Sequence, residues 1–72
     1  MSTVQLTADQ FEQTVLQDGI VLIDFWASWC GPCKSFAPVF EQSATNHPDA
    51  VFAKVDTEAE QQLSGALGIR SI

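Results

Sequence analysis

The spacing of apolar and polar residues along this 72-residue chain predicts three strands that alternate with three helices. The expected strands are residues 4–6, 20–26 and 50–55, and the expected helices lie within residues 7–18, 34–47 and 57–67. Strands that alternate with helices are typical of right-handed βαβ crossovers. The pattern therefore predicts a single α/β domain with a parallel or mixed sheet.

Residues 20–26 form the most apolar stretch of the chain, with the sequence IVLIDFW. A nearly continuous run rich in branched residues is expected for a central parallel strand covered on both faces. In the helix predicted after it, apolar residues recur at helical spacing from Phe36 to His47. Pro38 lies inside this helix and removes one backbone hydrogen bond, so we expect a kink there.

Short sequence signals mark where the other helices begin and end. Residues 7–10 and 57–60 each match a capping box, in which two side chains bond reciprocally to the first turn of a helix. Gly19 and Gly68 follow the predicted first and third helices and are expected to end them.

Composition limits the size, location and partners of this domain. Nine acidic and three basic residues give a net charge of −6, which argues against binding to nucleic acid or to an anionic membrane. No apolar run reaches the roughly 18 residues of a membrane span, and the N-terminus resembles no secretion signal, so we expect a cytoplasmic protein. A core of this size supplies roughly 3–5 kcal/mol at best.

The sequence Trp-Cys-Gly-Pro-Cys, residues 29–33, joins the apolar strand to the following helix. This order places both thiols at a helix N-terminus, where free backbone N–H groups favour an anion. We therefore expect a lowered pKa for the thiol of Cys30, which becomes the nucleophile, with Cys33 within disulfide reach. Pro32 fixes φ in the first turn, and Gly31 is expected to leave the sulfur of Cys30 uncovered.

Other interpretations of the two cysteines remain open. A zinc site needs four ligands, and the only histidine, His47, is predicted on the order of 20 Å further along the same helix. Two chains could still pool four cysteines around a metal ion or an iron–sulfur cluster. A structural disulfide is less favoured, because so small a loop stabilises a fold little. The spacing favours redox chemistry with no metal.

Asp24 is the one charged residue within the apolar strand 20–26. A carboxylate there is expected to be paired or functional, because its burial is unfavourable. Burial raises the pKa of a carboxyl group and suits it to proton exchange near neutral pH. The alternatives are an acid that points into solvent from an edge strand and an acid held in a tolerated ion pair.

Three other residues near the cysteines are singled out by their type. Trp29 is expected on the surface beside Cys30, where it limits solvent access and offers a flat apolar contact. Trp26 is expected to pack beneath the active-site turn. The charge of Lys34 fits assistance to the thiolate as well as it fits an ordinary solvated helix residue. Elsewhere in the chain, five acids are interpreted as ordinary exposed helix charges: Asp9, Glu12, Glu41, Glu58 and Glu60.

The string at residues 29–33 resembles the active-site signature of the thioredoxin family, and the resemblance covers all 72 residues. It implies a thioredoxin-like α/β fold in the order βαβαβα and a protein-disulfide reductase in which Cys30 attacks and Cys33 resolves. Asp24 would accept the proton of Cys33 through water, and Lys54 would pair with Asp24, although a surface lysine is the alternative for it. The resemblance implies no bound cofactor.

The same resemblance implies partners, and an incomplete domain. Protein disulfides would be the substrates, and a flavoprotein thioredoxin reductase that uses NADPH would supply electrons. A complete member continues with a cis-proline, two strands and a helix, so residues 1–72 are expected to be a truncated thioredoxin domain. Its strand 20–26 would then expose an edge. The alternative function is an interaction module with little turnover, which docks with a complementary fragment or a second copy.

Overall fold

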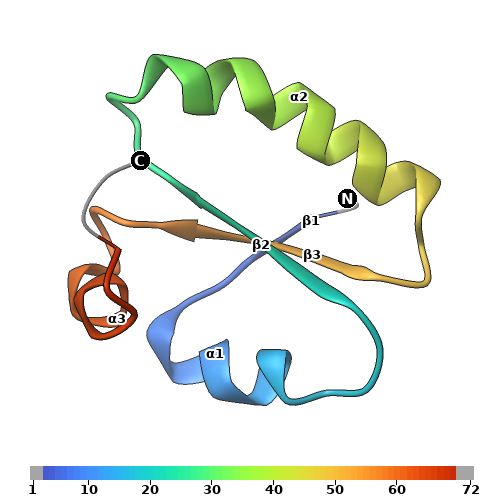
Figure 1. The fold of residues 1–72 in the computed structure, drawn as a ribbon, viewed down its shortest axis with the longest axis horizontal. Coiled ribbons are helices and arrows are strands. Elements are labelled where there is room, and N and C mark those ends of the chain that lie inside the picture. Colours follow the sequence, from blue (N-terminus) through green and yellow to red (C-terminus); the bar gives the residue numbers. More distant parts are fainter. Residues whose placement is uncertain (1–2, 70–72) are drawn as a thin grey trace.

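The computed structural model describes residues 3–69 and has the predicted alternation of strands and helices. Its elements, in chain order, are β1 (Thr3–Gln5), α1 (Ala8–Val15), β2 (Val21–Trp26), α2 (Gly31–Asn46), β3 (Val51–Asp56) and α3 (Gln61–Ala66). Figure 1 shows this arrangement. The resemblance implies that residues 68–72 lead to the cis-proline loop of a complete member, and of these residues 70–72 lie outside the described residues.

The strands form one parallel sheet in the order β1-β3-β2. The central strand is therefore β3, whose Phe52, Ala53 and Val55 are buried. The expectation that residues 20–26 form a central strand covered on both faces is wrong for the described residues, where β2 lies at an edge and Leu22 is 40% exposed. The expectation that this strand exposes an edge is confirmed for the same residues. An apolar run signals that a strand needs cover, but it does not say on which side a neighbouring strand lies.

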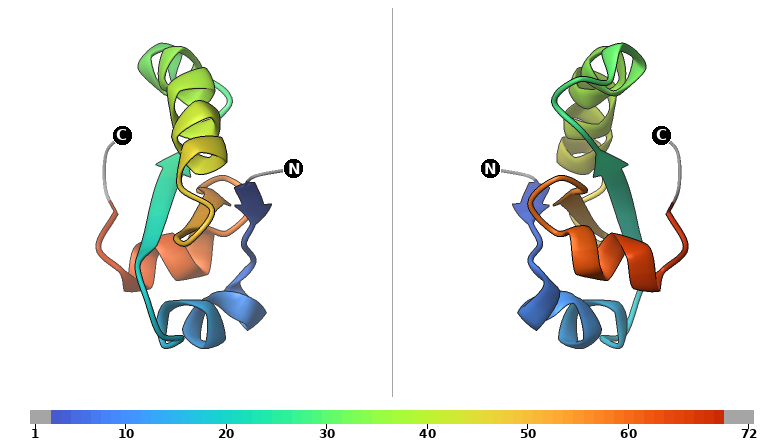
Figure 2. Two further views of the ribbon diagram at one scale, coloured as in Figure 1. Left: turned by 90° about the vertical axis from the view of Figure 1, so that its right-hand side faces the viewer. Right: turned by 90° about the vertical axis from the view of Figure 1, so that its left-hand side faces the viewer.

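Helices cover both faces of the sheet. In Figures 1 and 2, α2 crosses one face while α1 and α3 lie against the other. The α1 and α3 side holds a cluster of Leu6, Ala53 and Val55, packed against Phe11, Ile23, Phe25 and Leu63. The α2 side holds a cluster of Phe40, Ala44 and Phe52, packed against Ala50. Two small clusters, rather than one large core, therefore join the layers.

Neither predicted capping box forms. Thr7 is the N-cap of α1, but its hydroxyl donates to the carboxylate of Asp9 and makes no cap bond to the helix backbone. The backbone N–H of Ala8 donates instead to Oε1 of Glu60, at 2.9 Å. A residue distant in sequence thus accepts one of the free N–H groups in the first turn of α1.

The second predicted box lies before α3 rather than within it, because α3 begins at Gln61. The hydroxyl of Thr57 donates to the carbonyl of Trp26 at 3.0 Å, and Oδ1 of Asp56 accepts the N–H of Glu58 at 2.9 Å. These bonds form a turn that connects β3 to the loop after β2. Tertiary bonding therefore overrides the local cap signal.

The two glycine signals mark turns correctly. Gly68 has a φ of +77° and follows Leu67, the C-cap of α3, and Gly19 has a φ of +94°. Both values lie in the left-handed region that glycine adopts at little cost. Helix α1 ends at Val15, earlier than expected, so Gly19 shapes the turn into β2 rather than the end of the helix itself.

Candidate active site

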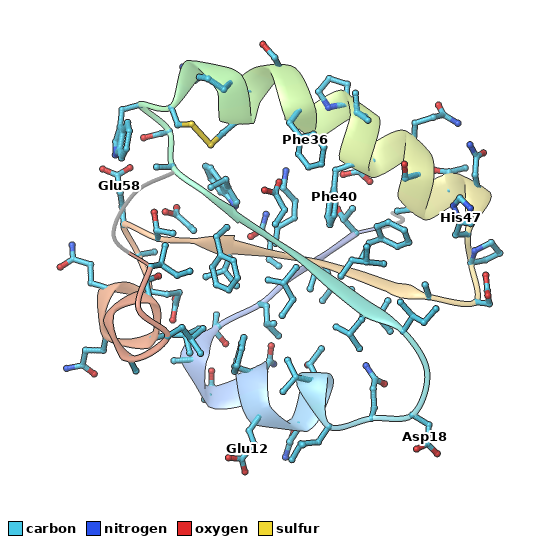
Figure 3. All side chains as sticks on the ribbon, viewed as in Figure 1. Glu12, Asp18, Phe36, Phe40, His47 and Glu58 are labelled. Atoms are coloured by element: carbon cyan, nitrogen blue, oxygen red, sulfur yellow. A yellow bond between two sulfur atoms is a disulfide. The ribbon has the colours of Figure 1, made fainter. Side chains whose placement is uncertain are left out.

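The two cysteines lie in the first turn of α2, as the sequence predicts. The helix begins at Gly31 instead of Lys34, which makes Cys30 its N-cap residue and places Pro32 within the first turn. Proline is tolerated there because the first N–H groups of a helix have no intrahelical acceptor. Figure 3 shows the sulfurs where β2 passes into α2.

Cys30 and Cys33 form a disulfide, with their Cα atoms 5.3 Å apart. The backbone N–H of Cys33 donates to Sγ of Cys30, with 3.2 Å between the nitrogen and the sulfur. The sulfur of Cys30 thus occupies the position that a capping oxygen takes at other helix starts. A free N–H group and the positive end of α2 both favour negative charge at this atom.

The exposure of the two cysteines differs from the expectation. Cys30 is only 3% exposed, while Cys33 is half-buried. The prediction that the sulfur of Cys30 is uncovered is therefore wrong for the disulfide form, in which this side chain folds back over the first turn. A Cβ at Gly31 would meet no atom of residues 3–69 within 4 Å, so packing within that part of the chain does not require a glycine there.

Asp24 lies half-buried on β2. Its Oδ2 is buried and has no hydrogen-bond partner among residues 3–69. Burial raises the pKa of this carboxyl group, and the positive charge of Lys54 opposes the rise. The expectation of a carboxyl group with a raised pKa on this strand is therefore confirmed, while its part in proton transfer is not tested by the geometry.

Lys54 on β3 is the direct neighbour of Asp24 in the register of the two strands. The charged groups nevertheless form no ion pair, and Nζ of Lys54 lies 5.6 Å from the ring centroid of Trp26. An ammonium at this distance from an indole gains a cation–π attraction. The predicted neighbours are thus correct, but Lys54 lies over an aromatic ring instead of bonding directly to the acid.

The two tryptophans occupy the expected environments. Trp29 is 65% exposed beside Cys30 in sequence, and Trp26 is half-buried, with an indole Nε1 that is buried and unpaired. Pro38 lies inside α2 and is exposed; the kink predicted there stays a prediction.

One contact of the active-site loop was not predicted. The hydroxyl of Ser28 donates to Oε1 of Glu58 at 2.8 Å. Glu58 follows β3, and Figure 3 shows it at the same end of the molecule as the disulfide. It is therefore not the ordinary helix charge that the sequence indicates. No local signal marks it, because the contact depends on how the loops after two neighbouring strands meet.

A groove of about 720 Å³ runs between β2 and α2. Several of its apolar residues are exposed, including Ile20 (65%), Phe36 (46%) and Val39 (56%). The side chain of Asp24 also lines it. We call this the groove; it follows the free edge of β2.

The described residues offer no cluster of metal ligands. Within residues 3–69, no three histidine, cysteine or acidic side chains gather in a way that could hold a metal ion. His47 lies at the far end of α2 from the disulfide, where its Nδ1 is 2.9 Å from the carbonyl oxygen of Ser43. None of the helices in the same part of the chain is long and apolar enough to cross a membrane.

The fold and the disulfide define a class: small α/β proteins that carry a C-x-x-C pair at the start of a helix, after a parallel strand. Comparison with known proteins identifies the family. The sequence model of the Thioredoxin family matches residues 2–72. The chain belongs to the thioredoxin family.

Individual relatives agree with this assignment. The chain is 61% identical over 71 residues to a protein from Streptomyces coelicolor that carries the name thioredoxin 2, covering 99% of this chain and 53% of that one. It is 47% identical to thioredoxin C-3 of Corynebacterium nephridii, covering 100% of this chain and 50% of that one. The chain thus spans about half the length of the curated relatives it matches.

Solved structures confirm the fold. The thioredoxin of Malassezia sympodialis superimposes with a TM-score of 0.85 at 42% identity, covering 97% of this chain and 64% of that one. A point mutant of the thioredoxin from Halobacterium salinarum gives a TM-score of 0.86 at 34% identity, covering 97% and 62% of the two chains. The predicted thioredoxin-like α/β fold is therefore confirmed.

Proposed function

We propose that the chain is a protein-disulfide reductase that acts by dithiol–disulfide exchange between Cys30, Cys33 and a protein substrate. The observation that carries the proposal is the disulfide at the start of α2, with the N–H of Cys33 directed at Sγ of Cys30. When the disulfide is reduced, the same N–H group and helix terminus stabilise a thiolate at Cys30. Membership of the thioredoxin family supports the assignment.

The exchange transfers two electrons in two steps. The Cys30 thiolate attacks one sulfur of the substrate disulfide, which forms a mixed disulfide and releases the other substrate sulfur as a thiolate. Cys33 then loses its proton and attacks the sulfur of Cys30, which releases the second substrate thiolate. The substrate is reduced, and the chain is left with the Cys30–Cys33 disulfide seen here.

Asp24 is the proposed acceptor of the proton that Cys33 loses. The raised pKa of its buried carboxyl group brings proton uptake closer to neutral pH, and Lys54 limits the rise. A water molecule is the proposed bridge between Asp24 and Cys33. Trp29, exposed beside Cys30, offers the substrate an apolar surface.

The redox centre needs only the two sulfurs and no bound cofactor. A thioredoxin reductase, a flavoprotein that uses NADPH, is the proposed source of electrons. A cytoplasmic location belongs to the same proposal, because a reducing compartment keeps such a dithiol ready to attack.

Reduction of insulin by dithiothreitol tests the proposal. The wild-type chain should accelerate insulin precipitation, and Cys30→Ser should abolish the acceleration. Cys33→Ser should trap a mixed disulfide that is visible by mass. An unmodified chain that gives no more precipitation than dithiothreitol alone contradicts the proposal.

A second function is favoured by the groove. An unpaired strand edge beside exposed apolar residues is a site for β-augmentation, so an interaction module with little turnover is the alternative. Two results together would favour this alternative. The wild-type chain and Cys30→Ser would be equally inactive in insulin reduction, and light scattering would show a dimer.

A further inference from the structure

A small crevice opens beside the disulfide, on the side of Cys33. Its volume is about 230 Å³, and its lining includes Trp26, Ser28, Cys33, Lys34 and Lys54. Cys33 is the more exposed of the two cysteines, so a group held in the crevice lies next to the accessible half of the disulfide. The crevice is distinct from the groove, which is lined mainly by residues earlier in β2 and later in α2.

The crevice concentrates positive charge on an acidic chain. The chain has a net charge of −6 and only three lysines and arginines, and two of the three, Lys34 and Lys54, line this one crevice. Neither ammonium forms an ion pair or a hydrogen bond within residues 3–69. The neighbouring acids are Asp24, which lines the groove, and Glu58, which accepts the hydroxyl of Ser28.

One further feature suits the crevice to an anion. The ammonium of Lys54 is held over the indole of Trp26, at 5.6 Å from the ring centroid, so its position is defined before any ligand binds. Lys34 lines the same crevice. Two ammonium groups on one small crevice match a carboxylate.

We propose that this crevice binds one acidic side chain of the protein or peptide that exchanges with the disulfide. Its volume admits a single carboxylate side chain rather than a whole peptide. An acidic residue close to the reacting cysteine of the partner would then be held beside Cys33. The chain thereby selects partners that carry an acidic residue near the reacting cysteine, although its own net charge is negative. This inference rests on the proposed exchange chemistry.

Rates of exchange with short peptide thiols test the selection. The oxidised chain is reduced by a peptide in which aspartate flanks cysteine and, separately, by its asparagine counterpart. The ratio of the two rates is compared among wild type, Lys34→Gln and Gln13→Glu. Both variants change the net charge from −6 to −7, but Gln13 is exposed on α1, against the opposite face of the sheet. The two peptides differ in intrinsic reactivity, but this difference cancels because the same ratio is compared among the three chains.

We expect Lys34→Gln to lower the ratio by about twofold to fivefold at low salt, the range that exposed ion pairs give, and Gln13→Glu to leave it nearly unchanged. An equal fall in both variants would assign the effect to net charge and overturn the site. An unchanged ratio in Lys34→Gln would overturn it as well.

A binding measurement separates this site from the exchange chemistry. The acidic peptide with serine in place of cysteine is titrated into the oxidised chain, and the indole N–H resonance of Trp26 is followed by NMR. A saturable shift that the asparagine peptide does not produce supports the site, even if no exchange occurs and the proposed function fails. Absence of that shift, with exchange intact, overturns the site alone.

Discussion

Asp24 and Lys54 lie directly opposite each other on β2 and β3, yet their charged groups do not form an ion pair. The carboxyl oxygen Oδ2 of Asp24 is buried and unpartnered, while the ammonium of Lys54 lies over the ring of Trp26. The positive charge of Lys54 therefore stabilises the carboxylate of Asp24 at a distance, without a direct contact between the two groups. This arrangement explains why burial outweighs the lysine and leaves the pKa of Asp24 raised.

The pKa of Asp24 links stability to pH. Because the pKa is raised in the folded chain, the stabilising contribution is complete when the group is protonated in both states, below the unfolded value near 3.8. It is lost as pH rises through the higher folded value. We expect Asp24→Asn to raise the free energy of unfolding at pH 7, by less than about 1 kcal/mol because solvent screens the partly exposed carboxylate, and to reduce its pH dependence above pH 4.

Urea unfolding between pH 4 and pH 8 measures this effect. Asp18→Asn is the matched control, because Asp18 is exposed and lies outside the sheet. Destabilisation by Asp24→Asn at pH 7, or the same pH dependence as the control, would contradict the account. The exchange rate near neutral pH should fall in Asp24→Asn, which lacks the proposed proton acceptor.

Phe40 carries much of the packing between α2 and the sheet. It is 6% exposed and contacts Phe52 edge to face, with ring centroids 5.2 Å apart. Phe40→Ala should cost about 3–5 kcal/mol. That is as much as the whole core of so small a domain supplies, so the variant should be unfolded by circular dichroism at 25 °C.

Phe36 is the control for this substitution. It lies one helical turn before Phe40, with ring centroids 5.8 Å apart, but it is 46% exposed. Phe36→Ala should cost about 1 kcal/mol and leave the fold intact, because nearly half of the side chain is already in water. Equal loss in both variants would mean that α2 does not pack on the sheet as described.

The groove should make the chain associate or expose apolar surface. We expect sedimentation to show concentration-dependent dimers. We also expect the fluorescence of ANS to rise when the folded chain is added. Val39→Glu places a charge in the groove and should reduce both signals. Leu16→Glu is the control, since Leu16 is 74% exposed but does not line the groove. A monomer without ANS binding would argue against an available groove.

Much of the architecture could be predicted from periodicity. The alternation of strands and helices, and the place of the two cysteines at a helix start, follow from local sequence. The central position of β3 does not follow from periodicity, because both β2 and β3 are apolar enough to be central; only the family resemblance indicated an open edge at strand 20–26. Strand order depends on which neighbours meet in space.

The candidate site also has some features that local sequence predicts and others that it does not. Asp24 was recognisable as a charge in an apolar strand. The position of Lys54 over Trp26 and the bond from Ser28 to Glu58 depend on contacts between different elements. The burial of Cys30, the N-cap residue of α2, depends on what surrounds it in the folded chain, which the local residue pattern does not give.

The central claim is that the start of α2 stabilises a negative charge on Cys30. The most direct test is the rate of alkylation of each cysteine in the reduced chain, measured against pH with peptide mass analysis. The account predicts that Cys30 reacts as a thiolate at a pH well below the value of about 8.5 for a free thiol. It also predicts that the pair closes again on oxidation. Reaction of Cys30 with the pH profile of an unperturbed thiol, together with a pair that stays open, would contradict the account.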